Sequence, residues 1–358
     1  MFRNFRTLTI NDKQFNAPEL KTLCAYKLKI LKPDNWEYKF YRFVSEWLND
    51  SAYITAHTSG TTGVPKKIKI RKEAMLRSAQ MTNRFLKLRK GDTALLALSC
   101  DYIAGKMMVA RSFAGSLNLI PVEPSANPLK FVSTKQKIAF ASFVPLQVKA
   151  ILKNSSVGKF TGIRNVLIGG APLTPELRKK FSHYRNNIFE TYGMTETISH
   201  IALKRLSAPA SGWFKTLDAI TVKKDKRDCL VLNVPFISKK SIITNDIVAL
   251  QSSKHFKWLG RADNVINSGG VKLLPETLEE KIKPLMKRRF FLKGKKDSLL
   301  GEKSVLVIEG SAFSPPALSA LQKKLHRHLH KYELPKEIVF IPKFRETASG
   351  KIIRSFTK

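Results

Sequence analysis

The nine residues Thr58-Ser-Gly-Thr-Thr-Gly-Val-Pro-Lys66 are the most informative stretch of this sequence. They hold two glycines, four hydroxyl side chains and a lysine, and they follow the mostly apolar run 52–56. Glycines let the backbone approach an anion closely, hydroxyl and backbone N–H groups donate to phosphate oxygens, and lysine adds a positive charge. A solvated loop between two strands is the alternative. The stretch is not a Walker loop, because Pro65 stands five residues after Gly60, where that pattern needs glycine.

Three further motifs follow the first one in order along the chain. The second is Thr191-Tyr-Gly-Met-Thr-Glu-Thr197, and the third runs from Thr244-Asn-Asp246 and Gly260-Arg-Ala-Asp263 to Asn267-Ser-Gly-Gly270. The fourth is Thr347-Ala-Ser-Gly-Lys-Ile-Ile-Arg354. Each has an ordinary structural alternative when taken alone: a capped helix start, a β-hairpin turn, and a solvated lysine near a basic end. Their occurrence together and in this order favours a shared function.

The four motifs together resemble those of the adenylate-forming superfamily, which includes acyl-CoA synthetases, luciferases and the adenylation domains of peptide synthetases. The resemblance covers about residues 52–354. It implies an α/β protein: a large N-terminal layered α/β domain with a β-rich subdomain, followed by a small mobile α+β domain. We place these domains at residues 1–262 and 263–358, with the hinge at Asp263.

Within this superfamily the sequence is most similar to the o-succinylbenzoate–CoA ligases of menaquinone biosynthesis. The likeness rests on three segments: Leu167–Leu173, Tyr192–His200 and Gly260–Gly270. The implied reaction joins o-succinylbenzoate to CoA through an acyl-AMP intermediate, with release of AMP and diphosphate from ATP. Another aryl- or fatty-acid–CoA ligase, an adenylating enzyme that loads a carrier protein, and a non-enzymatic binder of nucleotide or nucleic acid are the alternatives.

The resemblance assigns catalytic and nucleotide-binding roles to single residues. Lys351 would bridge the acyl carboxylate and the phosphate, Thr195 would bond to the reacting phosphate, and Glu196 would help to hold Mg²⁺. The residues that would bind the ATP phosphates are Thr58, Ser59, Gly60, Thr61, Thr62, Gly63 and Lys66. The residues that would bind adenine and ribose are Gly169, Gly170, Ala171, Tyr192, Gly193, Asp246 and Arg261.

The same resemblance assigns residues to CoA and to the acid. Gly269 and Gly270 would leave room for the pantetheine arm of CoA. Tyr102 stands where many relatives carry a histidine near the acyl pocket, and Lys106 is the candidate cation for a second carboxylate of the acid. A solvated helix lysine is an equal alternative for Lys106. His200 is the third candidate for the acyl pocket.

The order of apolar runs predicts a layered α/β domain. Short apolar runs separated by helical stretches are typical of a largely parallel sheet, and loops at the carboxyl ends of its strands are the expected ligand site. The predicted strands lie at 93–99, 118–122, 138–142, 166–168 and 188–190, and predicted helices lie at 39–48 and 73–88. Short alternating strands at 211–250 predict the β-rich subdomain, and strands at 305–309 and 338–341 belong to the last domain.

The composition indicates a globular enzyme without a membrane span. The 358 residues, of which 43% are hydrophobic, are enough for two domains with a sizeable core. No apolar run approaches the ~18 residues that a membrane span needs, and the first residues lack the apolar core of a signal peptide. Three widely spaced cysteines indicate a reducing compartment and no metal site. We therefore expect a cytoplasmic monomer or homodimer.

The net charge of +37 is spread over both halves of the chain rather than gathered in a tail. No nucleic-acid recognition motif accompanies it, so we expect no specific nucleic-acid partner. A positive field suits a site whose ligands are ATP, CoA and a small carboxylic acid, all of them anions. The charge is also compatible with peripheral contact with an anionic membrane surface.

The role of Lys351 gives the first prediction. Lys351→Ala should lower the rate of acyl-AMP formation by about 10²-fold or more, because a charge-stabilising group aimed at the reacting oxygens is lost. The variant should still form the thioester from acyl-AMP that is supplied ready-made. Both half-reactions are measured separately, and equal losses in the two would contradict the assignment.

Overall fold

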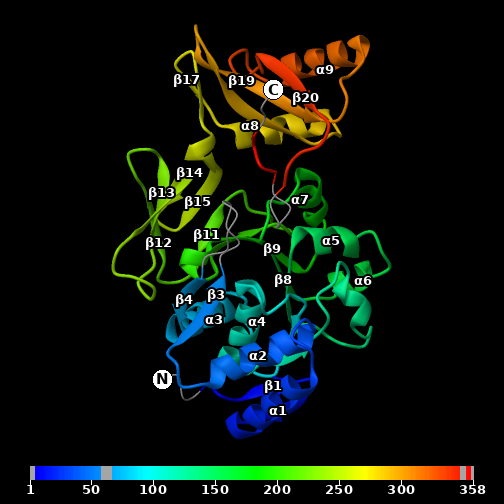
Figure 1. The fold of residues 1–358 in the computed structure, drawn as a ribbon, viewed down its shortest axis with the longest axis vertical. Coiled ribbons are helices and arrows are strands. Elements are labelled where there is room, and N and C mark those ends of the chain that lie inside the picture. The colour runs from blue at the N-terminus through cyan, green and yellow to red at the C-terminus, as the bar shows by residue number, and fades with distance from the viewer. Residues whose placement is uncertain (1–4, 58–66, 347–351, 356–358) are drawn as a thin grey trace. The chain divides into compact units, whose positions relative to one another are not determined.

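The computed structural model describes residues 5–57, 67–346 and 352–355 (Figure 1). The chain divides into two compact units. The first comprises Met1–Thr221 and Val234–Lys240, and the second comprises Val222–Asn233 and Ser241–Lys358. The expected division into residues 1–262 and 263–358 is defined by a hinge movement at Asp263, so it stays a prediction.

The first unit is built on a largely parallel sheet, as the apolar runs predict. Its strands are β1 (Leu8–Ile10), β2 (Lys13–Phe15), β5 (Thr93–Leu96), β6 (Asn118–Pro121), β7 (Phe140–Phe143), β8 (Asn165–Ile168), β9 (Asn187–Gly193), β10 (His200–Arg205) and β11 (Phe214–Thr216). They lie in the order β11-β10-β9-β8-β7-β5-β6-β1-β2. Neighbours from β9 to β1 are parallel, while β2, β10 and β11 join antiparallel. The expected α/β fold class is confirmed.

Helices fill the connections of this sheet. They are α1 (Ala17–Ile30), α2 (Trp36–Leu48), α3 (Lys72–Phe85), α4 (Ile103–Gly115), α5 (Pro145–Ile151), α6 (Val157–Thr161) and α7 (Pro175–Phe181), with short 3₁₀ turns η2 (Pro128–Phe131) and η3 (Thr195–Thr197). The helix predicted to reach residue 88 ends at Phe85, because Lys87 has a φ of 52°, which no helix continues. All four residues of β8 are buried, as expected for a central parallel strand covered on both faces.

Helix α2 shows how the sequence sets this packing. Asn35 caps its first turn, accepting from the N–H of Glu37. Phe40, Phe43, Val44 and Trp47 recur at helical spacing and are buried, and the Trp47 ring stacks on Phe113 of α4 with 5.6 Å between centroids. A hairpin of β3 (Tyr53–His57) and β4 (Lys67–Arg71) follows this helix and forms a separate two-stranded sheet.

The second unit holds two sets of strands, which pair mostly antiparallel. The first set, in chain and spatial order, is β12 (Thr221–Lys224), β13 (Cys229–Asn233), β14 (Ile242–Ser252) and β15 (His255–Arg261). After η4 (Ala262–Asn264) come β16 (Ile266–Ser268), β17 (Val271–Leu273), α8 (Pro275–Ile282), η5 (Lys283–Leu285), β18 (Phe290–Asp297), β19 (Gly301–Glu309), α9 (Pro315–His328) and β20 (Glu337–Ile341). The predicted strands at 305–309 and 338–341 lie within β19 and β20, and β20 joins β19 in parallel.

Alternation along β19 separates two small cores. Leu306 and Ile308 face a cluster that includes Leu321 of α9 and Ile282 of α8. Val305 and Val307 face a second cluster, with Phe291 and Phe344. Figure 1 shows α9 beside the sheet that β19 and β20 form. Successive side chains of a strand point to opposite faces, so this one strand organises both cores.

Candidate active site

Two parts of the predicted site lie outside the described residues. They are the phosphate loop, residues 58–66, and Lys351. The described residues on either side show how each part is approached. Strand β3 leads to the loop, and Arg354 is the last residue of the lysine motif.

Two glycine positions bring β8, β9 and the following turn close together. Strand β8 ends at Ile168, and Ile168 lies opposite Glu190 of the parallel strand β9. A side chain at Gly169 would collide with the Thr191 hydroxyl, and one at Gly193 would collide with the backbone of residues 199 and 200. These glycines are therefore required by close packing. The structure thus places Gly169 beside the start of the Thr191–Thr197 motif.

The residues expected around adenine follow directly from these strands. Gly170 has a φ of 85°, a conformation that glycine adopts without strain, and Ala171 comes next in the loop after β8. The ring of Tyr192 packs against Phe214 with 5.8 Å between centroids. Whether these residues contact a nucleotide stays a prediction.

Glu190 fixes β9 just before this motif. Its carboxylate accepts from Arg178 of α7 at 3.0 Å and 3.2 Å, and it lies 2.7 Å from the ammonium of Lys204. Burial raises the pKa of Glu190, but Lys204 and Arg178 outweigh it and hold the pKa below its usual value. Strand β9 is therefore held by a cluster of one carboxylate and two basic side chains.

Thr195 and Glu196 lie in η3, the short turn between β9 and β10. Thr197 stabilises this turn, since its hydroxyl accepts from the N–H of Met194 at 2.9 Å. Glu196 is exposed and forms no ion pair with another described residue. Among the residues that the structure describes, no three acidic, histidine or cysteine side chains gather as a metal site. A single free carboxylate fits Mg²⁺, which proteins often hold with one or two carboxylates and the phosphates of the substrate.

Asp246 and Arg261 face each other in the second unit. They are opposite residues of β14 and β15. Asp246 is buried, and its Oδ1 accepts from Trp258 Nε1 at 3.2 Å and from Arg261 Nη1 at 3.4 Å. Burial lowers the pKa of Arg261, but its bonds to Asp263 and Asp246 outweigh it and raise the pKa. The two residues expected at the ribose are therefore together.

The expected hinge residue is bonded to the same arginine. Arg261 Nη2 donates to Asp263 Oδ2 at 2.6 Å, and Asn245 Nδ2 donates to the other oxygen at 3.1 Å. Gly269 and Gly270 have φ angles of 57° and 79° and form the two-residue turn between β16 and β17. The hairpin interpretation of this motif is confirmed. Their role toward CoA stays a prediction.

The segment after Lys351 is anchored by Arg354. Its guanidinium donates to both carboxylate oxygens of Glu279, at 2.6 Å and 2.7 Å, and to the carbonyl of Leu292 at 3.2 Å. Burial raises the pKa of Glu279, and the charge of Arg354 opposes this shift. A bidentate pair of this kind fixes position as well as distance.

The three candidates for the acyl pocket differ in their surroundings. Tyr102 precedes α4 and is 63% exposed, whereas Lys106 and His200 are buried. Lys106 is therefore not the solvated helix lysine that was the alternative. Its ammonium lies 3.6 Å from the carboxylate of Glu46, so its charge is already balanced. This weakens its expected role as the cation for a second carboxylate.

Arg111 is a candidate that the sequence motifs did not reveal. It is 2% exposed, and its Nη2 donates to the hydroxyl of Ser199 at 2.9 Å and lies 3.4 Å from His200 Nδ1. Burial lowers the pKa of Arg111 to about 9. No described carboxylate pairs with it, and its buried Nε has no hydrogen-bond partner. The available signal was an arginine inside the mostly apolar run 107–113.

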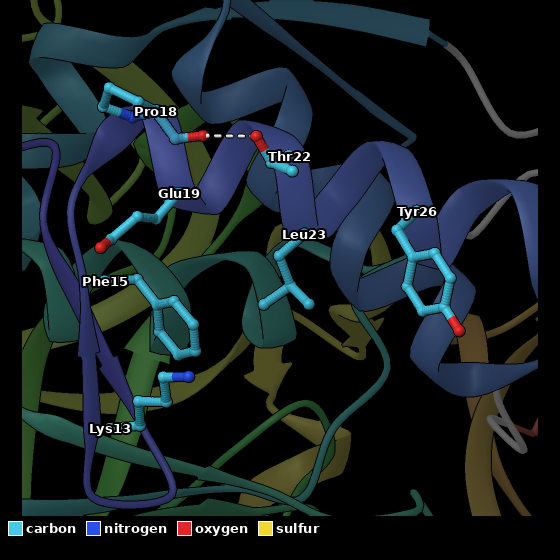
Figure 2. Close-up of a pocket in the computed structure, with 7 residues that line it drawn as sticks. All are labelled: Lys13, Phe15, Pro18, Glu19, Thr22, Leu23 and Tyr26. Carbon is cyan, nitrogen blue, oxygen red and sulfur yellow. Dashed lines mark hydrogen bonds between the residues drawn. The ribbon is translucent and has the colours of Figure 1, made fainter.

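A shallow groove elsewhere on the first unit is not this site. It has a volume of about 540 Å³ and lies on α1 and β2. Figure 2 shows its lining: Lys13, Phe15, Pro18, Glu19, Thr22, Leu23 and Tyr26. None of these is a predicted site residue. No helix in the described parts of the chain is long and apolar enough to cross a membrane, and all three cysteines are buried and unpaired.

His200 gives a stability prediction. Burial, reinforced by the charge of Arg111, holds its pKa well below the ordinary 6.5. At a pH below 6.5, His200 therefore binds a proton in the unfolded chain but not in the folded one. The free energy of unfolding falls as the pH drops below the ordinary histidine pKa. At about pH 5.5 the wild type should lose about 1.4 kcal/mol more than His200→Gln does, each relative to about pH 8. Urea unfolding at both pH values checks this, and parallel losses would show that folded His200 is protonated.

Known proteins resemble this chain over most of its length. The family model described as AMP-binding enzyme matches residues 11–227. A probable 2-succinylbenzoate–CoA ligase of Mycobacterium tuberculosis is 28% identical over 336 residues, which cover 87% of this chain and 85% of that protein. The solved structure of an AMP-forming acyl-CoA synthetase/AMP-acid ligase II-like protein from Dyadobacter fermentans is 36% identical, with a TM-score of 0.63, and the match covers 93% of this chain and 96% of that one.

A second solved structure supports the fold. The o-succinylbenzoate CoA synthetase of Bacillus subtilis, in complex with its acyl-adenylate intermediate, has a TM-score of 0.76 at 17% identity, and the match covers 98% of this chain and 94% of that one. The expected adenylate-forming fold is thereby confirmed. The family match spans more than half of the 358 residues, and the chain therefore belongs to the AMP-binding enzyme family.

Proposed function

We propose that this enzyme is an AMP-forming acid–CoA ligase and that its acid is o-succinylbenzoate, also called 2-succinylbenzoate. The relatives named above support the reaction type and, by their names, this acid. The observation that carries the choice of acid within this chain is the buried, carboxylate-free guanidinium of Arg111.

The reaction needs activation of the acid before the thioester can form. A carboxylate is a poor acyl donor because its leaving group would be oxide. Its attack on the α-phosphate of ATP gives acyl-AMP and diphosphate, and the protein contributes positioning and charge neutralisation. In this proposal the loop 58–66 holds the β- and γ-phosphates, and Lys351 orients the two reacting oxygens. Mg²⁺, when held at Glu196, spreads the negative charge of the phosphates.

The second step is attack by the CoA thiolate on acyl-AMP, with AMP as the leaving group. We propose that the C-terminal part turns about Asp263, which withdraws Lys351 and presents the Gly269–Gly270 turn to the pantetheine arm. Asp246 accepts hydrogen bonds from the ribose hydroxyls in both steps. Such a change of arrangement between two half-reactions is a known mode of gating.

The acid has a second carboxylate that does not react. Burying it without a partner costs free energy, and burying an unpaired cation does too. Pairing Arg111 with this carboxylate would reduce the free-energy cost of burying each charge. The hydroxyl of Ser199 is half-buried and already bonded to Arg111, so we place it as the donor that the carboxylate meets first. The apolar surface of Phe140, 6.0 Å from the guanidinium, lies beside this pair.

The acid preference is tested with Arg111→Met. Wild type should prefer o-succinylbenzoate over benzoate and medium-chain fatty acids in kcat/KM by at least roughly 10²-fold, because a site built for a charged group rejects analogues that lack it. Arg111→Met should narrow this preference. It should also leave the thermal midpoint equal or higher, because an unpaired buried cation is replaced by an apolar side chain of similar length.

Three outcomes separate the parts of this proposal. A preserved preference in Arg111→Met would place the second carboxylate elsewhere. A wild-type preference for a fatty acid or plain benzoate would overturn the acid and leave the ligase. AMP or acyl-AMP without a CoA thioester would indicate an adenylating enzyme that loads a carrier protein. Arg42→Met is a matched control, since Arg42 is an exposed arginine paired with Asp101.

The ribose site is tested with Asp246→Asn, which keeps the shape of the side chain. ATP binding should weaken by about 1–3 kcal/mol, because a buried site is left with an unsatisfied partner. Titration calorimetry measures the affinity. Glu337→Gln is the control. It likewise replaces a carboxylate of the second unit that pairs with basic side chains, in this case two lysines. An unchanged ATP affinity in Asp246→Asn would refute the ribose assignment.

A further inference from the structure

The side chains of Glu46 and Lys106, from two different helices, form hydrogen bonds with the backbone of one residue, Thr55. Glu46 belongs to α2, Lys106 to α4 and Thr55 to β3. The N–H of Thr55 donates to Glu46 Oε1 at 2.9 Å, and its carbonyl oxygen accepts from Lys106 Nζ at 2.6 Å. Because Nζ also lies 3.6 Å from Glu46 Oε2, the two side chains form a closed ring around one peptide position.

This ring supplies the hydrogen bonds that a neighbouring strand would otherwise give to the backbone of Thr55. Among the strands that the structure describes, β3 pairs with β4 alone, and Thr55 lies opposite Lys69. Alternate residues of an antiparallel pair turn both backbone groups away from the partner strand. At Thr55 those two groups are bonded by side chains. The outer edge of β3 is thus held at Thr55 by an acidic and a basic side chain from two helices.

The surroundings show that Lys106 is committed to this position. Its side chain is buried, and the ring of Phe43 lies 5.3 Å from the ammonium. Burial lowers the pKa of Lys106, and the charge of Glu46 opposes this shift. A buried lysine is unfavourable unless its partners are well placed. The partners found here are a carboxylate and one backbone carbonyl.

Thr55 stands three residues before Thr58, the first residue of the predicted phosphate loop. We propose that Glu46 and Lys106 are positioning residues that set where β3 delivers this loop to the ATP phosphates. Lys106 then acts on the nucleotide through Thr55 and does not contact the acid. This inference rests on the proposed function of the loop. It predicts that the pair matters for acyl-AMP formation, which uses the β- and γ-phosphates, and not for the later attack of CoA.

Lys106→Met tests this prediction through the two half-reactions. Diphosphate release is measured at varied ATP, and thioester formation is measured from acyl-AMP supplied ready-made. A misplacement of about 1 Å can cost roughly 10²-fold in rate. We expect kcat/KM for ATP to fall about ten- to one hundred-fold, while the KM for the acid and the thioester step stay within about twofold. Lys106→Arg should recover part of the loss, because a guanidinium can donate to both partners.

Glu46→Gln provides a second and milder probe. The amide oxygen can still accept from the N–H of Thr55, but the charge that faces Lys106 is gone. We expect a smaller loss in kcat/KM for ATP, and we expect the loss in the double variant with Lys106→Met to be less than the product of the two single losses. If Lys106→Met does not fold, Glu46→Gln alone must show the ATP-selective loss, and an unaltered ATP dependence would overturn the proposal.

Lys159→Met is the matched control. Lys159 also donates to backbone carbonyls, those of Leu129 and Val132, and no part of the site is assigned to it. It should leave both half-reactions at the wild-type level. Equal losses of both half-reactions in Lys106→Met would reduce the pair to a general stabilising contact. A lost acid preference with normal ATP dependence would make Lys106 an acid ligand instead. Absence of diphosphate release by the wild type with any acid would refute the proposed function itself.

Discussion

The parallel pairing of β5, β7, β8 and β9 is the constraint on which the first unit depends. Parallel neighbours end at the same edge of a sheet, so loops that are distant in sequence are brought together there. The glycines that follow β8 and end β9 let this edge close, because any side chain at those positions would strike a neighbour. The site thus depends on strand direction first and on individual contacts second.

Buried charge is treated in two different ways in this unit. Glu190 has two cationic partners and Lys106 has a carboxylate and a carbonyl, so both are satisfied within the protein. Arg111 has a hydroxyl and a histidine but no carboxylate among the described residues. Satisfied clusters hold strands in place, whereas an unsatisfied cation leaves free energy to be gained from an anionic ligand. The contrast separates scaffold from candidate pocket without reference to sequence motifs.

The sequence predicted what local pattern determines. Apolar runs located the parallel strands, and the Asn267–Gly270 motif located a two-residue hairpin turn, because both signals lie within a few neighbouring residues. The surroundings of Lys106 and Arg111 could not be predicted in this way. The partners of Lys106 lie 51 and 60 positions earlier in the chain, at Thr55 and Glu46, and periodicity does not show what faces a buried lysine. The phosphate loop and Lys351 lie outside the described residues, so their roles rest on the motifs.

Arg261 has a consequence beyond the strand pair that carries it. One guanidinium is shared between the carboxylate expected at the ribose and the carboxylate expected at the pivot. Donor groups on one side chain are a finite supply, so a ligand that recruits Arg261 alters what remains for Asp263. Under the proposed roles of Asp246 and Asp263, thermodynamic linkage would make that effect mutual: nucleotide occupancy would change the ease of turning, and the turn would change nucleotide affinity equally. A single arginine would then couple nucleotide occupancy to the turn that separates the two steps of the reaction.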